Sequence, residues 1–240
     1  MRYIDDNSLS EKLQSAYKKL HSTETALLRV HDDILRAVDR GCTVVLLLLD
    51  LSAAFDTVDH DLLLHILNTR FGIKGKVLAW FKSYLPDRNQ FVSINGSNSS
   101  RSDMMYGVPQ GSVLGAILYL LYASPLGDII RQHDMNFHFY ADDCQVYLSF
   151  DSGSSVTMQK IESCLEDIAT WMSLNKLKLN SEKTELLVFG SQNLSVSQFP
   201  SFIAIDGSVI QPSQFVRNIG VIFDKKLNME HQVADWLAQW

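Results

Sequence analysis

A run of six apolar residues, ended by a carboxylate, constrains the fold of this chain more than any other feature. Residues 44–49 are all Val or Leu, and Asp50 follows them directly. An uninterrupted apolar run of this length predicts a central strand that is buried on both faces. Because ligands in layered sheets bind at the ends of central strands, Asp50 is a candidate site residue.

Two adjacent carboxylates mark a second candidate site. Residues 137–140 are mostly aromatic, and residues 145–150 alternate between polar and apolar side chains, so we expect two strands, the second half-buried. Asp142 and Asp143 fall in the tight turn between them. Like charges at one turn repel each other, and each raises the pKa of the other. A surface hairpin turn, where Asp is common for backbone reasons, is the alternative interpretation.

The three carboxylates converge if these strands are neighbours in one sheet. Converged anions in a low-dielectric setting are costly unless a divalent cation neutralises them. An all-oxygen ligand set favours Mg²⁺ or Mn²⁺ over zinc. Asp59 and Asp61 also follow Asp50, but we assign them to the start of the next helix, which Leu62 and its apolar neighbours define.

A stiff loop before an apolar helix is a third candidate feature. Gly107, Pro109 and Gly111 bracket Gln110, and residues 113–123 are almost entirely apolar. A helix N-terminus presents free N–H groups that suit a phosphate or a sugar oxygen. Gly115 lowers helix stability by about 1 kcal/mol relative to Ala. Close approach of another backbone, of a substrate or of a second helix would each explain it.

Charge and composition restrict the class of protein. The chain of 240 residues has 46% hydrophobic and 20% charged residues and a net charge of −6, which is typical of a globular protein. Residues 70–103 are positively charged although the chain as a whole is negative. They contain six Lys or Arg and two Asp, which gives a net charge of +4. A basic segment beside an acidic pocket suits a polyanion that reaches a metal ion. A solvated surface is the alternative.

The cysteine spacing and the N-terminal sequence are informative about the cellular compartment of the protein. The three cysteines form no C-x-x-C pair, the first residues lack the apolar stretch of a signal peptide, and we expect no apolar run near the roughly 18 residues that span a bilayer. We therefore expect an intracellular protein of the nucleus or cytoplasm, neither secreted nor membrane-bound.

Periodicity and turn signals predict the remaining elements. We expect helices at residues 9–40 (ending at Gly41), 74–85, 155–174 and 229–240; strands at 90–94, 177–180, 184–189 and 218–223; hairpin turns at Asn95-Gly96 and within 203–210; and a loop at 191–199.

Five motifs in a fixed order resemble those of the reverse transcriptase domain of non-LTR (LINE-type) retrotransposons. They are a carboxylate motif (49–56), a template- and nucleotide-binding loop and helix (107–115), a metal-binding box (140–143), a lysine-bearing motif (175–184) and a primer-grip hairpin (218–224). The resemblance runs from about residue 14 to residue 223. It implies an α+β right-hand polymerase palm, an antiparallel sheet with helices on one face.

The resemblance also implies an activity and its residues. The chain would be an RNA-directed DNA polymerase that joins dNTPs to a DNA primer on an RNA template, with two Mg²⁺ or Mn²⁺ ions. Asp50 and Asp142 would bridge the ions and Asp143 would complete the site. Lys183 would protonate the leaving pyrophosphate; a solvated lysine beside two glutamates is the alternative.

Four further residues receive substrate-binding roles from the resemblance. Phe55 would exclude a 2′-hydroxyl by its bulk, or be a core aromatic. Gln110 and Gly111 would contact the nucleotide or template, or Gln110 would make only a loop hydrogen bond. Lys18 stands where the family has Arg in a fingers motif, at residues 14–18, and loses bidentate phosphate contact.

The resemblance implies one reverse transcriptase domain over residues 1–240. Residues 1–40 and 75–106 would be fingers-like, 41–74 and 107–225 would form the palm, and 226–240 would begin a truncated C-terminal region. We expect a fragment that lacks the thumb and an upstream fingers segment, with Ala116 in place of the family's Pro. Two alternatives stay open: a remnant that binds nucleic acid without polymerising, and a carboxylate-metal nuclease.

Overall fold

The computed structural model describes residues 2–151, 156–190, 202–205 and 207–238. The chain divides into two compact units, which we call the first and the second unit. The first comprises Met1–Ser10, Ala53–Ser124 and Leu174–Leu177, and the second comprises Glu11–Ser52, Pro125–Ser173 and Lys178–Trp240. The expected division into fingers-like and palm ranges has other bounds and stays a prediction.

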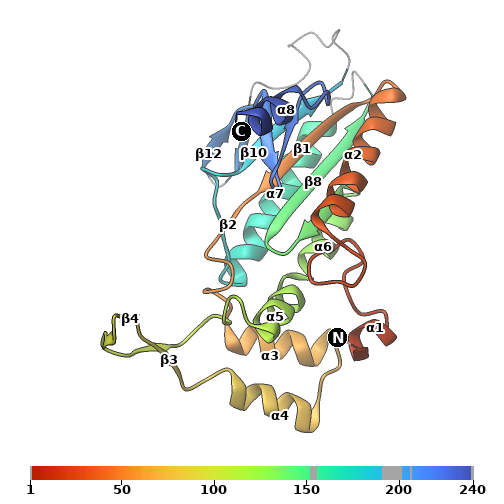
Figure 1. Ribbon diagram of the computed structural model, residues 1–240. Helices are drawn as coiled ribbons and strands as arrows, with labels where there is room; N and C mark the ends of the chain where they lie inside the picture. Colours follow the sequence, from red (N-terminus) through yellow and green to blue (C-terminus); the bar gives the residue numbers. More distant parts are fainter. Residues whose placement is uncertain (1, 152–155, 191–201, 206, 239–240) are drawn as a thin grey trace. The chain divides into compact units, whose positions relative to one another are not determined.

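The second unit is built on a four-stranded antiparallel sheet in the order β10-β1-β8-β7. Figure 1 shows the two central strands side by side. The sheet strands are β1 (Thr43–Leu49), β7 (Asn136–Tyr140), β8 (Asp143–Phe150) and β10 (Glu185–Phe189). The predicted central strand is confirmed, since all but one residue of β1 is buried. The α+β fold class is confirmed as well.

Both faces of this sheet are covered. On one face, the core joins Val30 and Ile34 of α2 (Thr23–Asp39) to Leu46 of β1 and to Phe223 of the hairpin β13–β14. On the other face lies α7 (Val156–Leu174), whose Cys164 is close enough to Cys144 of β8 for the two thiols to interact electrostatically. The expectation of helices on one face is therefore wrong: helices pack on both faces, because the side chains of β1 are apolar in both directions.

Small hairpins and short elements complete the second unit. They are β2 (Leu51–Ser52) with β9 (Lys178–Leu179), β11 (Ile203–Ile205) with β12 (Ser208–Ile210), β13 (Phe215–Asn218) with β14 (Val221–Asp224), α6 (Leu126–Gln132) and α8 (Glu230–Leu237). The strand expected at 218–223 is therefore wrong at Ile219 and Gly220, which form a turn with positive φ, and right at residues 221–223, which belong to β14. The loop expected at 191–199 lies outside the described residues.

The first unit is mainly helical. Its elements are α1 (Arg2–Asp6), α3 (His60–Thr69), α4 (Gly75–Tyr84), α5 (Val113–Ala123) and the antiparallel pairs β3 (Arg88–Gln90) with β6 (Ser102–Met104) and β4 (Ser93–Ile94) with β5 (Ser97–Asn98). Asp59 caps α3 by accepting a hydrogen bond from the Leu62 N–H at 3.0 Å, as predicted. The Asn95-Gly96 turn is also confirmed.

Local sequence signals define both ends of α2. The expected helix at 9–40 is wrong before residue 23, where α2 begins with a capping box between Ser22 and Thr25. It ends as predicted near Gly41, whose φ is +84°. The Gly41 N–H donates to the Val38 carbonyl and the Cys42 N–H to the Ala37 carbonyl, which is the Schellman pattern.

One stretch has the length and hydropathy of a membrane-spanning helix, contrary to expectation. An 18-residue window within residues 113–132 has a mean hydropathy of 1.7, and 61% of that window is buried. It is not one helix, because α5 ends at Ala123 and α6 begins at Leu126. A mostly buried, interrupted apolar stretch is the pattern of core helices.

Candidate active site

Two candidate carboxylates lie at the ends of neighbouring strands in the second unit. The antiparallel register pairs Leu49 of β1 with Cys144 of β8, so Asp50 follows β1 where Asp143 begins β8. On its other side, Asp143 pairs with Tyr140 of β7. The turn between β7 and β8 consists of Ala141 and Asp142 alone. The sheet therefore brings strands that are distant in the sequence together, as the sequence predicts.

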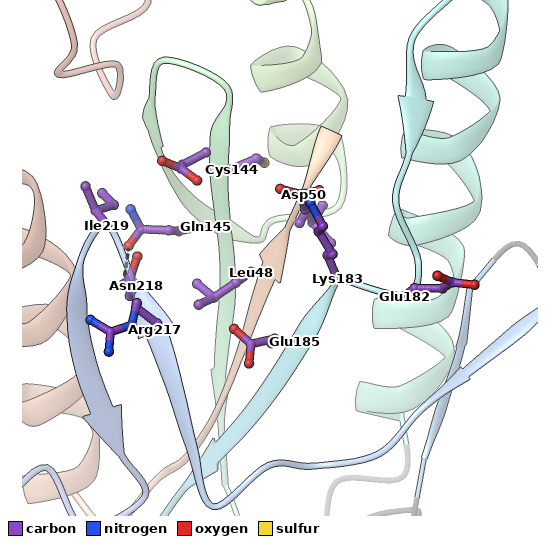
Figure 2. Close-up of a pocket in the computed structure, with 12 residues that line it drawn as sticks. Leu48, Asp50, Cys144, Gln145, Glu182, Lys183, Glu185, Arg217, Asn218 and Ile219 are labelled. Atoms are coloured by element: carbon purple, nitrogen blue, oxygen red, sulfur yellow. Dashed lines mark hydrogen bonds between the residues drawn. The ribbon is translucent and has the colours of Figure 1, made fainter. Parts of the chain in front are cut away.

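A pocket of about 380 Å³ opens at this end of the sheet. Figure 2 shows the side chains around it, which come from the ends of β1 and β8, from the turn before β10, from β10 itself and from the hairpin β13–β14. The amides of Gln145 and Asn218, both buried, are joined in it by a hydrogen bond of 2.8 Å. Its lining residues are Leu48, Leu49, Asp50, Asp143, Cys144, Gln145, Glu182, Lys183, Glu185, Arg217, Asn218 and Ile219.

The charges at the strand ends act on one another. The pKa of Asp143 is raised to about 6, first by desolvation of its carboxyl group and then by the negative charges of Asp142 and Asp50. Asp143 remains accessible from solvent at the start of β8. A raised pKa of Asp143 beside two further negative charges marks an environment that a divalent cation also stabilises.

The three carboxylates are not all grouped in one metal-binding arrangement. Asp50 and Asp143 line the pocket, whereas Asp142 does not. Within the described residues, no three His, Cys, Asp or Glu side chains are placed to hold a metal ion together. The donor chemistry nevertheless fits a hard cation, because Asp50 and Asp143 offer carboxylate oxygens to one space and Asp142 is near enough to shift the pKa of Asp143.

Lys183 lies on a turn that is hydrogen-bonded to the backbone of Asp50. The Asn180 N–H donates to the Asp50 carbonyl at 2.9 Å, and the Lys183 N–H donates to the Asn180 carbonyl at 3.1 Å. The Lys183 side chain is exposed and lines the pocket with Glu182 and Glu185. Figure 2 shows it directed toward the end of β1. This placement agrees with both interpretations of Lys183 and decides between neither.

In the first unit, Phe55 and Gln110 have opposite surroundings. Phe55 is 6% exposed and stacks on Tyr119, with ring centroids 4.5 Å apart, which is the packing of a core aromatic. Gln110 and Gly111 are exposed in the loop before α5. A role in nucleotide selection therefore stays a prediction for Phe55. The substrate-binding roles of Gln110 and Gly111 also stay predictions, and both residues are accessible to a ligand.

The loop before α5 is held against its own helix, and this explains Gly115. Ser112 caps α5 by accepting from the Gly115 N–H at 2.9 Å, and its hydroxyl donates to the Pro109 carbonyl at 2.8 Å. A Cβ at residue 115 would lie 2.1 Å from that carbonyl oxygen. Of the explanations left open by the sequence, close approach of another backbone is the one that the structure shows.

Lys18 lies in the second unit, in the segment before α2. Its ammonium group donates to the backbone carbonyl of Glu11. This bond orients the side chain locally, and a role for Lys18 in triphosphate binding stays a prediction.

The basic segment of the first unit is largely on the surface. Lys74, Lys76 and Lys82 of α4 and its N-cap are exposed, as are the apolar side chains of Val77 and Trp80 on the same helix. α4 buries none of its residues. Guanidinium groups lie over aromatic rings nearby, Arg88 over Tyr84 and Arg101 over Phe91. Exposed cations interleaved with aromatic rings suit single-stranded nucleic acid.

Sequence reasoning missed the buried amides of this site. Gln145 was expected on the polar face of a half-buried strand, but it is 1% exposed because α2 and the hairpin β13–β14 cover that face. Its Nε2 has no hydrogen-bond partner in the described part of the chain. Gln14, within the fingers-like motif, was also overlooked in favour of Lys18. In a strand that alternates polar and apolar residues, nothing in the sequence marks Gln145 as buried.

Comparison with known families places these features in context. The sequence profile of the family described as "Reverse transcriptase (RNA-dependent DNA polymerase)" matches residues 2–223. Among curated proteins, the chain is 28% identical over 230 residues to the RNA-directed DNA polymerase from mobile element jockey of Drosophila melanogaster. It is 32% identical over 222 residues to the "Probable RNA-directed DNA polymerase from transposon BS" of the same organism. These alignments cover 93% and 89% of the chain but only 24% of either relative. The chain thus spans about a quarter of the length of the curated relatives it matches.

Solved structures support the same fold. The structure of apo telomerase from Candida tropicalis, truncated from its C-terminal domain, superposes with a TM-score of 0.60 at 14% identity. The match covers 90% of this chain and 40% of the telomerase chain. At this identity the likeness establishes the fold and nothing about substrates.

Proposed function

The chain belongs to the reverse transcriptase (RNA-dependent DNA polymerase) family, and we propose that it extends a DNA primer on an RNA template by adding dNTPs. The observation that carries this proposal is the placement of Asp50 and Asp143 at neighbouring strand ends, lining one pocket. The family generally uses divalent metal ions. We propose that Asp50, Asp142 and Asp143 hold two Mg²⁺ or Mn²⁺ ions here.

The residues of the pocket would have separate roles in nucleotidyl transfer. When bound, the metal ions supply electrostatic stabilisation of the attacking 3′-oxygen and of the leaving pyrophosphate. The chain's own part is to hold the three carboxylates at the end of β1 and at the turn between β7 and β8. Lys183, on the turn fastened to Asp50, would donate a proton to the leaving pyrophosphate.

Nucleic acid would be recognised mainly by charge and stacking. The exposed lysines of α4 and the Arg–aromatic pairs of the β3–β6 region suit the phosphates and bases of the RNA template. Gln110 and Gly111, at the N-terminus of α5, suit the incoming dNTP or the template strand. Template binding would then weaken steeply as salt concentration rises.

Primer extension on poly(rA)/oligo(dT) with dTTP tests the proposed activity. We expect Mg²⁺- or Mn²⁺-dependent extension by the wild-type chain. Asp142→Asn should lower the rate by at least about a hundredfold, because several kcal/mol of transition-state stabilisation depend on the metal ions. Asp61→Asn, which changes an exposed acid in the first turn of α3, is the matched control. Equal rates for Asp142→Asn and Asp61→Asn would reject the proposal.

One observation favours a second candidate function, nucleic-acid binding without polymerisation. The exposed lysines of α4 and the Arg–aromatic pairs of the first unit suit a polyanion without any metal ion. On this function, the chain would bind an RNA/DNA hybrid in a salt-dependent manner and show no metal-dependent extension. The same primer-extension assay, paired with a filter-binding measurement on the same hybrid, separates the two functions.

A further inference from the structure

The turn that carries Asp142 has a strained first residue. Ala141 has a φ of +56°, whereas Asp142, the other residue of this two-residue turn, does not have a positive φ. A hairpin turn with positive φ at its first central position prefers glycine, because a Cβ is disfavoured there. An alanine in this conformation persists only if the surroundings hold it.

The side chain of Gln14 holds both backbone groups of Ala141. Its Oε1 accepts from the Ala141 N–H at 3.1 Å, and its Nε2 donates to the Ala141 carbonyl at 3.3 Å. The same Oε1 also accepts from the Ala16 N–H at 2.8 Å. Gln14 is 5% exposed, so these bonds are shielded from water and the side chain has little freedom.

The backbone around Gln14 is fixed to the strand that leads into the turn. The Ser15 N–H donates to the Phe139 carbonyl at 3.0 Å, and the Phe139 N–H donates to the Leu13 carbonyl at 2.8 Å. These bonds form a parallel bridge along the open edge of β7. The Ser15 hydroxyl lies 2.8 Å from Nε2 of His138, which adds a side-chain link to the same strand.

We propose that Gln14 is a positioning residue for the catalytic carboxylates: its amide fixes Ala141 in the left-handed conformation and thereby sets where Asp142 and Asp143 lie. The inference rests on the proposed function for its catalytic consequence. The effect of Gln14 on the conformation of the turn at Ala141 and Asp142 does not depend on that function. Because Asp142 and Asp143 repel each other, a turn without this amide has alternative conformations that separate them.

The test compares Gln14→Met with Gln132→Met, a change of an exposed glutamine on α6. Methionine keeps the approximate volume of glutamine and removes both hydrogen bonds. We expect Gln14→Met to lower kcat in primer extension at least tenfold, with the KM for dTTP changed less than threefold. Gln132→Met should match the wild type. Addition of Ala141→Gly to Gln14→Met should recover most of the lost kcat, because glycine adopts the positive φ without support.

Two readouts do not depend on polymerase activity. Hydrogen exchange of the Ala141 amide should be slow in the wild type and at least tenfold faster in Gln14→Met. Mn²⁺ binding to the free chain should weaken in Gln14→Met and recover with Ala141→Gly. If the wild type does not polymerise, the proposed function fails while these two readouts still decide the role of Gln14.

The proposal is overturned if Gln14→Met exchanges the Ala141 amide as slowly as the wild type, or if Ala141→Gly recovers neither kcat nor Mn²⁺ binding. The second result would mean that Gln14 contributes only general stability. If Gln14→Met does not fold, Gln14→Leu takes its place, because it also removes both hydrogen bonds without adding a charge, and the same readouts apply.

Discussion

At the scale of single residues, burial lowers the pKa of His138 and so links folding to pH. His138 is 3% exposed on β7, and its pKa is lowered to about 4, first by desolvation and then by the positive charge of Arg29. Its ordinary value is 6.5. Between these values the unfolded chain binds a proton that the folded chain does not, so the free energy of unfolding falls as the pH falls from about 6.5 to about 4.

His138→Gln should remove this contribution. We expect the variant to lose less stability than the wild type over that pH range, by up to about 3 kcal/mol, since one pKa unit corresponds to about 1.4 kcal/mol. Urea unfolding at pH 7, 5.5 and 4 measures the difference. His65→Gln, at an exposed position of α3, should follow the wild type. A His138→Gln curve parallel to that of the wild type would show that His138 does not stay neutral in the fold.

At the scale of elements, the loop before α5 depends on one glycine. Replacing glycine by alanine inside a helix ordinarily stabilises it by about 1 kcal/mol. For Gly115→Ala we expect the opposite, a loss of about 1–3 kcal/mol, because the new Cβ would collide with the Pro109 carbonyl and displace the loop that presents Gln110.

Thermal or urea unfolding of Gly115→Ala measures this loss. Ala79→Gly on the exposed helix α4 shows the effect of propensity alone, about 1 kcal/mol of destabilisation. Gly115→Ala as stable as the wild type would mean that the loop yields to the added methyl group without cost.

Elements with strong periodicity were predictable from the sequence, and those fixed by distant contacts were not. The apolar run before Asp50 and the helix at 113–123 were located almost to the residue. Residues 9–22 were expected to be helical, but residues 13–15 pair with β7, a contact that no local pattern reveals. Ile219 is β-branched and apolar, which favours a strand, yet its φ of +44° places it in a turn.

The same division holds for the site. Asp50 and Asp143 were predictable as neighbours because each ends or begins a strand of one sheet. Gln145 was not, since its burial depends on the hairpin β13–β14, about 70 residues further along the chain. Gln14 acts on Ala141 through side-chain bonds to the backbone, which leave no mark in the sequence of the turn itself.

At the scale of the whole molecule, the account rests on one claim, that Asp50, Asp142 and Asp143 together hold divalent cations. The pKa of Asp143 is already raised, first by desolvation and then by the charges of Asp142 and Asp50, and cation binding relieves the repulsion among them. The most direct measurement is a Mn²⁺ titration of the free chain followed by the electron paramagnetic resonance signal of unbound Mn²⁺. We expect Asp50→Asn, Asp142→Asn and Asp143→Asn each to weaken binding at least tenfold, while Asp61→Asn binds as the wild type does. Binding by the three variants as tight as that of Asp61→Asn would contradict the account.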